Sequence, residues 1–143
     1  MNTSTVHSTF VQRNPDYFTR MSGNVYIHSL DRDRGFPILA LKPDITPKRL
    51  NKGLSSLGQP LRFLDDPVAA PREQAILSAI ETGQNQIYYY QYADAQIGRT
   101  FYFKTSVILL QENQEVIVQI EDDPDHWEKS HWQRGFWLAS VND

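Results

Sequence analysis

The chain of 143 residues contains no cysteine. This absence excludes disulfides, thiolate nucleophiles, cysteine-ligated zinc, iron–sulfur clusters and any cysteinyl adduct of a flavin. Because disulfide-free chains are typical of reducing compartments, we expect a cytoplasmic protein.

The sequence also has neither a long apolar run nor a large excess of one charge. No stretch approaches the roughly 20 apolar residues that a membrane span needs, and the polar start of the chain is unlike a signal peptide. The formal net charge of −3 gives no electrostatic preference for nucleic acid or anionic membranes. We therefore expect a soluble domain that binds neither nucleic acid nor membrane.

The first part of the chain predicts one short helix and a pair of strands. The first fourteen residues are polar and aperiodic, so we expect them to form a disordered or loosely docked lead. Asn14 followed by Pro15 has the form of a helix start. The elements expected here are a helix over 14–20, strands over 25–30 and 36–41, and short helical turns between 44 and 58.

The second part of the chain carries stronger patterns. Apolar residues at helical spacing predict a helix over 71–82, and Gly83 stands where glycine is favoured after a helix end. Alternating apolar residues then predict three strands joined by hairpin loops, over 86–92, 99–110 and 115–121.

The chain ends in a predicted aromatic helix. Asp123 and Pro124 form another helix start, and the helix should run from about residue 126 to 138. The order of elements predicts an α+β fold, in which a five-stranded antiparallel sheet has short helices on one face and flanking helices at both ends. We divide the chain into a lead with a short helix (1–23), a core (24–123) and a C-terminal interface helix (124–143).

Several segments, taken in order, resemble a PAS domain. They read Leu-Gly-Gln-Pro-Leu-Arg-Phe-Leu at 57–64, Ile-Leu-Ser-Ala-Ile-Glu-Thr-Gly at 76–83, Ile-Gly-Arg-Thr-Phe-Tyr-Phe at 97–103 and Val-Ile-Val-Gln-Ile-Glu-Asp-Asp at 116–123. The resemblance implies a PAS-like sheet with a ligand pocket against its helices. It also implies a non-enzymatic sensory and protein-interaction module in signal transduction.

Within PAS domains the chain is most similar to the light-oxygen-voltage subgroup. Residues 58–64 resemble the flavin motif G-x-N-C-R-F-L, with Leu61 in place of the reactive cysteine and Pro60 in place of the asparagine. Gln119 matches the glutamine that contacts flavin in that subgroup. Adduct chemistry is excluded because it needs a thiol. The strand positions that supply flavin-facing asparagines in that subgroup carry Gln91 and Phe103 here, so two amide partners of the ring are missing and we expect no resident cofactor. A PAS sensor that binds flavin without adduct chemistry is the alternative.

The resemblance also implies a set of pocket residues and a route to the terminal helix. The ligand pocket should be bounded by Leu61, Phe63, Ile76, Ile80, Phe103 and Gln119. The strand-to-helix relay should run through Glu121, Asp123 and Trp127, where Asp123 can cap the helix.

Exposed aromatic residues predict a partner surface and a homodimer. An outer sheet face that carries tyrosines would be an apolar patch, and such patches commonly mark interfaces. The alternative is that aromatic residues simply suit strands and the domain's own core. The expected surface consists of Tyr88, Tyr90, Tyr102, Ile108, Trp132 and Trp137, and the partner is a second copy, a signalling protein or a fused effector domain.

The sequence offers little support for metal binding or catalysis. His126 and His131 are five residues apart, unlike the i, i+4 pair of a helical metal site, so we expect no metal. We likewise expect no catalytic residues, and the acidic pairs are better explained as turn and capping groups. A small α+β pocket enzyme remains the rival, with His28 as its candidate inward-facing group.

Overall fold

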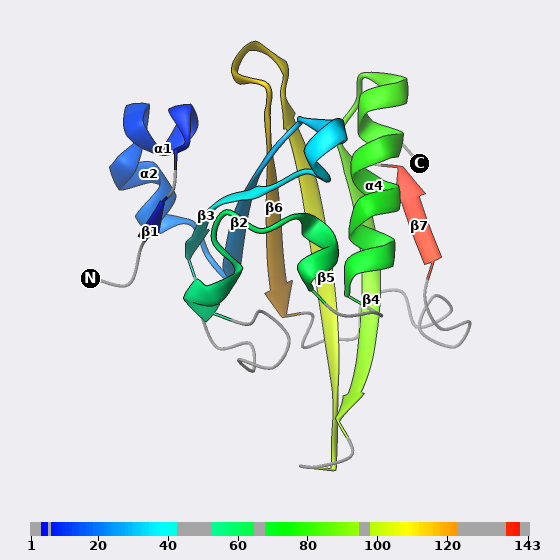
Figure 1. Ribbon diagram of the computed structural model, residues 1–143. Coiled ribbons are helices and arrows are strands. Elements are labelled where there is room, and N and C mark those ends of the chain that lie inside the picture. Colours follow the sequence, from blue (N-terminus) through cyan, green and yellow to red (C-terminus); the bar gives the residue numbers. More distant parts are fainter. Residues whose placement is uncertain are drawn as a thin grey trace.

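The computed structural model describes residues 4–5, 7–42, 53–64, 68–94, 98–122 and 137–140 (Figure 1). Its centre is one sheet whose paired strands are all antiparallel. In spatial order the strands are β1 (Ser4–Thr5), β3 (Ile38–Lys42), β2 (Asn24–Ser29), β6 (Glu115–Asp122), β5 (Arg99–Leu110), β4 (Gln86–Asp94) and β7 (Trp137–Ser140).

The pairing of β2 with β6 joins the two halves of the chain into this one sheet. Ile27 of the early hairpin lies opposite Ile117 of the late one, in a register that runs over six residue pairs from Asn24↔Ile120 to Ser29↔Glu115. The five strands β2 to β6 are thus the antiparallel sheet that the sequence predicts. The short strands β1 and β7 extend it at its two edges.

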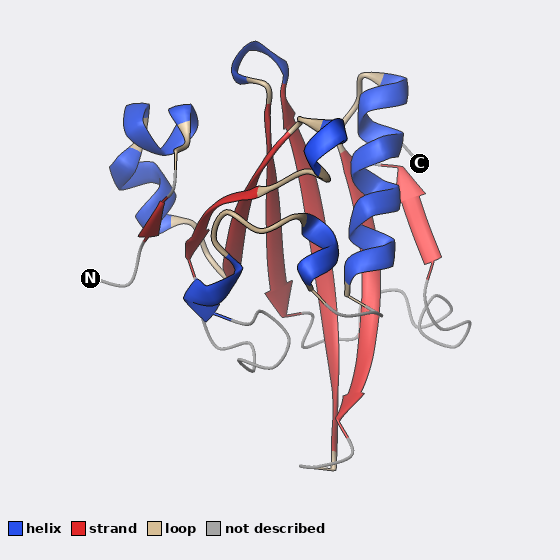
Figure 2. Cartoon of the chain, in the orientation of Figure 1, coloured by secondary structure: helices blue, strands red, loops and turns tan. Residues whose placement is uncertain are grey.

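The main helix, α4 (Ala69–Thr82), covers one face of the sheet (Figures 1 and 2). Its C′ residue Gly83 has a φ of 70°, the left-handed conformation that glycine adopts at low cost. The 3-10 turns η2 (Gly53–Ser56) and η3 (Leu61–Phe63) lead up to it, and η1 (Arg32–Arg34) and η4 (Gln111–Asn113) lie in the two hairpin connections.

Alternation along the strands places one set of side chains under α4. The resulting core is almost entirely aliphatic and aromatic, as the sequence pattern predicts. Its buried members are Tyr26, Phe36, Ile38, Leu41, Leu61, Leu64, Ala69, Ala75, Ile76, Ala79, Tyr88, Phe103, Val107, Val116 and Val118.

A second, smaller core lies on the opposite face of the sheet. There α1 (Thr9–Arg13) and α2 (Pro15–Arg20) pack Phe10 and Phe18 against Val25, Ile27 and Ile117. The helix expected over 14–20 is confirmed. The expectation of a loose lead is wrong for residues 7–14, because Ser8 caps α1 and Phe10 is buried.

The predicted C-terminal helix is wrong where the structure describes it. Residues 137–140 form β7, in which Trp137 lies opposite Tyr89 and Ser140 opposite Gln86. Residues 123–136, and the helical turn expected near 46–52, lie outside the described residues. The described part of the chain contains no helix with the length and apolarity of a membrane span.

Candidate functional site

The most unusual side chain in the core is an arginine. Arg72, the fourth residue of α4, has an exposed fraction of only 1%. It precedes Ala75 and Ile76 by three and four residues, so it lies on the same helical stripe that packs on the sheet. A guanidinium ion is therefore carried into the interior by the face of the helix that otherwise holds small and aliphatic residues.

A buried histidine accepts one hydrogen bond from this arginine. Arg72 Nη1 lies 3.3 Å from His28 Nε2, and His28 Nδ1 lies 2.9 Å from the carbonyl oxygen of Phe36. Because a guanidinium only donates and a carbonyl only accepts, the imidazole proton must be on Nδ1 and Nε2 must accept. Both ring nitrogens of the neutral His28 are thus engaged.

Two tyrosines complete what we call the Arg72 cluster, which consists of Tyr26, His28, Arg72 and Tyr88. The Cζ atom of Arg72 lies 4.1 Å from the centre of the Tyr26 ring, a cation–π contact, and Tyr26 stacks on the His28 ring at 6.0 Å. Tyr88 hydrogen-bonds both Arg72 and Thr105 through its side chain. The cluster therefore joins α4 to β2 and to the β4–β5 pair.

Burial keeps the partners of Arg72 uncharged. It raises the pKa of Tyr26 to about 12 and raises that of Tyr88, although Arg72 counteracts both shifts. Burial, followed by repulsion from Arg72, lowers the pKa of His28 to about 3, against a smaller opposing effect of the Phe36 hydrogen bond. At neutral pH the cluster carries one positive charge and no negative one.

No carboxylate neutralises that charge among the described residues. The ion pairs there are Arg34–Asp31 and Arg62–Glu73, and Arg72 takes part in neither. Its Nε is buried and has no hydrogen-bond acceptor. Because an unpaired buried ion costs several kcal/mol, the charge of Arg72 is incompletely compensated by the described residues.

The described residues offer little for catalysis or for a metal ion. They contain no group of three histidine, aspartate or glutamate side chains close enough to hold a metal. His28 is the inward-facing group on which the enzyme alternative depends, but its acceptor nitrogen is occupied by Arg72 and its proton is held by Phe36. It therefore has no free position from which to act as a general base.

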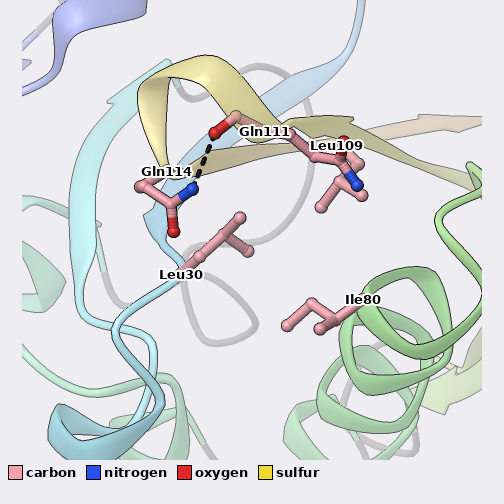
Figure 3. Close-up of a pocket in the computed structure, with 5 residues that line it drawn as sticks. All are labelled: Leu30, Ile80, Leu109, Gln111 and Gln114. Carbon is pink, nitrogen blue, oxygen red and sulfur yellow. Dashed lines mark hydrogen bonds between the residues drawn. The ribbon is translucent and has the colours of Figure 1, made fainter.

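A separate groove of about 340 Å³ lies at one end of the sheet (Figure 3). Its walls are aliphatic and amide side chains, and a 2.7 Å hydrogen bond from Gln114 to the Gln111 carbonyl closes one side. The groove is lined by Leu30, Ile80, Leu109, Gln111 and Gln114. None of these groups is charged or nucleophilic, so the groove offers no chemistry of its own.

The structure assembles only part of the pocket predicted from the sequence. Leu61, Ile76 and Phe103 are buried together in the core under α4, and Phe63 is half-buried. Ile80 is 40% exposed and lines the groove of Figure 3 instead.

The prediction for Gln119 is wrong. Its side chain lies on the opposite face of β6, where Nε2 donates to the carbonyl oxygen of Ser22 at 2.9 Å. Its neighbours Val118 and Ile120 are the residues that face α4. A flavin in the interior would therefore have no contact with this glutamine.

The structure supports few of the residues predicted for the partner surface. Tyr88 is 3% exposed and faces α4, so its assignment to a partner surface is wrong. Ile108 is half-buried and packs against the core under α1 and α2, and Tyr102 is half-buried on the same face. Tyr90 lies in β4 and Trp137 in β7, but the structure describes only their backbone. Trp132 lies outside the described residues.

Of the predicted relay residues, the structure describes Glu121. Its carboxylate accepts a 2.6 Å hydrogen bond from the Ser22 hydroxyl, next to the C-terminal end of α2. Asp123 and Trp127 lie outside the described residues. The described hydrogen bond of Glu121 is thus with the loop that joins α2 to β2.

Sequence reasoning missed the Arg72 cluster, although two of its signals are readable. Arg72 falls on the apolar stripe of the helix at 71–82, and the alternation of the strand at 25–30 puts Tyr26 and His28 on one face. The meeting of these two elements depends on tertiary packing. It could not be read from either segment alone.

No protein-family model matches the sequence, and the search of curated proteins finds no significant match.

Proposed function

We propose that the protein is a non-enzymatic, PAS-type sensory and interaction module that responds to a ligand or partner and transmits the response to its flanking helices. The antiparallel sheet, which has α4 on one face and α1 and α2 on the other, supports this proposal. The charged group enclosed between the sheet and α4 supports it as well. The observation that carries it is the position of β6, which contacts the interior on one face and the N-terminal helices on the other.

The interior face of β6 lies under α4. Val116 and Val118 are fully buried there, in the same core as Tyr26 and Tyr88 of the Arg72 cluster. Any rearrangement of that core changes the packing against β6, because protein interiors are close-packed.

The other face of β6 contacts α1 at the start of the strand and the loop after α2 at its end. At its start, Glu115 accepts hydrogen bonds from Ser8 and from the backbone N–H groups of Thr9 and Phe10. At its end, Gln119 and Glu121 both bond Ser22. A shift of β6 relative to α4 must therefore strain or release these contacts, which is the physical basis of the proposed relay.

The same proposal includes two further steps. The response passes beyond β6 through Asp123 and Trp127, and two copies of the chain pair through the sheet face that carries Tyr102.

Native mass spectrometry of the full chain, compared with its denatured mass, tests the proposed module. We expect a dimer or a non-covalent adduct that is lost on denaturation. A monomer with no adduct over the whole concentration range would contradict the proposed role.

The relay can be tested with two matched valines. Val118 of β6 and Val107 of β5 are register partners, and both are fully buried under α4. We expect Val118→Ala to increase hydrogen exchange at the amides of Thr9 and Phe10 more than Val107→Ala does, at equal loss of global stability. Equal effects of the two variants on these amides would show that β6 is not the route.

A further inference from the structure

The buried positive charge of Arg72 has no counter-ion among the described residues. The contact with the Tyr26 ring, at 4.1 Å, compensates it only partly, since the ring attracts a cation through its quadrupole and carries no net charge. His28 and the two tyrosines are uncharged partners. The cluster is therefore one negative charge short of neutrality.

The surroundings of the guanidinium favour an anion further. Arg72 lies in the first part of α4, where the helix dipole is positive, and no acidic residue stands in the first turn of that helix. The helix is preceded by Val68, which provides no side-chain cap. The buried Nε–H of Arg72 is an unused donor.

We propose that the Arg72 cluster binds a small monocarboxylate anion, which accepts a hydrogen bond from the Arg72 Nε–H. A carboxylate fits the planar donor geometry of a guanidinium. A single negative charge restores neutrality, whereas a divalent phosphate or sulfate would leave an excess negative charge in the core. The anion must be small, because Arg72 is almost inaccessible to solvent. This inference rests on the proposed ligand-binding function and names its ligand class.

Thermal unfolding and NMR of the full chain with acetate and propionate test the proposal. At ten times the dissociation constant we expect a rise in Tm of about 4 °C that continues to grow with the logarithm of the carboxylate concentration, and none with chloride at equal ionic strength. We also expect a shift of the Arg72 Nε–H resonance in the wild-type protein. That resonance is assigned by its loss in Arg72→Lys, which keeps the charge and removes the Nε donor.

Arg72→Met should abolish the Tm response, while Arg62→Met should retain it, because Arg62 is an exposed arginine paired with Glu73. The proposal is overturned by an unchanged Nε–H resonance, by a Tm response that is linear in carboxylate concentration, by the same response in Arg72→Met, or by stabilisation with sulfate or phosphate alone. If Arg72→Met does not fold, the wild-type resonance decides. The two proposals can fail separately. If the protein is a dimer and the Val118 test supports the β6 relay, but carboxylates have no effect at Arg72, this inference is wrong and the proposed function still holds.

Discussion

Ser8 and Glu115 are joined by a 3.0 Å hydrogen bond between side chains that are 107 positions apart in the sequence. Ser8 is at the same time the N-cap of α1, since its hydroxyl accepts from the N–H of Val11. The carboxylate of Glu115 also accepts from the N–H groups of Thr9 and Phe10, at 2.8 and 3.1 Å. One acidic side chain at the start of β6 thus attaches the first helix to the sheet.

Replacing Glu115 with glutamine should weaken this attachment. The neutral amide presents one oxygen acceptor instead of two, and charge-assisted hydrogen bonds are stronger than neutral ones. We expect a loss of about 1–3 kcal/mol in the free energy of unfolding, measured by urea denaturation, with increased hydrogen exchange in α1. Glu112→Gln, at an exposed position of the same hairpin, is the control and should leave both unchanged.

The buried His28 should make the protein sensitive to acid. The folded state keeps this imidazole neutral down to a pKa of about 3, whereas the unfolded chain binds its proton near pH 6.5. Between these values the unfolded state holds more protons, so stability falls as the pH falls, by up to about 1.4 kcal/mol per pH unit.

Urea denaturation at pH 7 and pH 5 measures this effect. His28→Gln should lose this component of the pH dependence, and His7→Gln, at an exposed histidine, should keep it. An NMR titration of the wild-type imidazole gives the same answer without a variant. Protonation of His28 in the folded protein near pH 6 would show that the explanation is wrong.

Two glycines with similar backbone angles should differ sharply in their tolerance of alanine. Gly23 has a φ of +76°, and an added Cβ would overlap the backbone carbonyl of Ile120. Gly98 has a φ of +63°, with nothing within 4 Å of that position. We expect Gly23→Ala to cost about 3 kcal/mol or more and Gly98→Ala about 1 kcal/mol. Equal losses in urea denaturation would mean that the close approach of Gly23 to β6 is not maintained in solution.

The exposed ion pair of Arg62 and Glu73, 2.7 Å apart, should contribute little to stability. Side-chain exposures of 51% and 28% leave the pair well solvated, and such pairs are typically worth less than about 1 kcal/mol. Glu73→Gln should therefore shift the urea midpoint only slightly. A loss of several kcal/mol would disqualify Arg62 as a control for Arg72.

The parts of the fold that local pattern determines were predictable. The helix expected over 71–82 is observed as Ala69–Thr82, and the strand expected over 99–110 is observed with those bounds. Both are long and strongly periodic, and Gly83 supplies the stop signal of the helix. The number and direction of strands β2 to β6 follow from the same patterns.

The rest depends on partners that are distant in the sequence. The α1 helix was missed because Glu115, which stabilises its first turn, is about a hundred residues away. Residues 137–138 were predicted as helix because their pairing with the edge of β4 is not visible locally. Gln119 was assigned to the wrong face because it was placed by resemblance, whereas alternation with Val118 decides its direction.

The outermost strands have a consequence for self-association. β1 has two residues and β7 has four, and they occupy opposite borders of the sheet. Strands this short offer few free backbone N–H and C=O groups to the edge strand of another copy. This disfavours edge-to-edge association into fibres. Six inter-strand spacings separate them, or about 29 Å, so one copy of the protein cannot cover both borders of another copy at once.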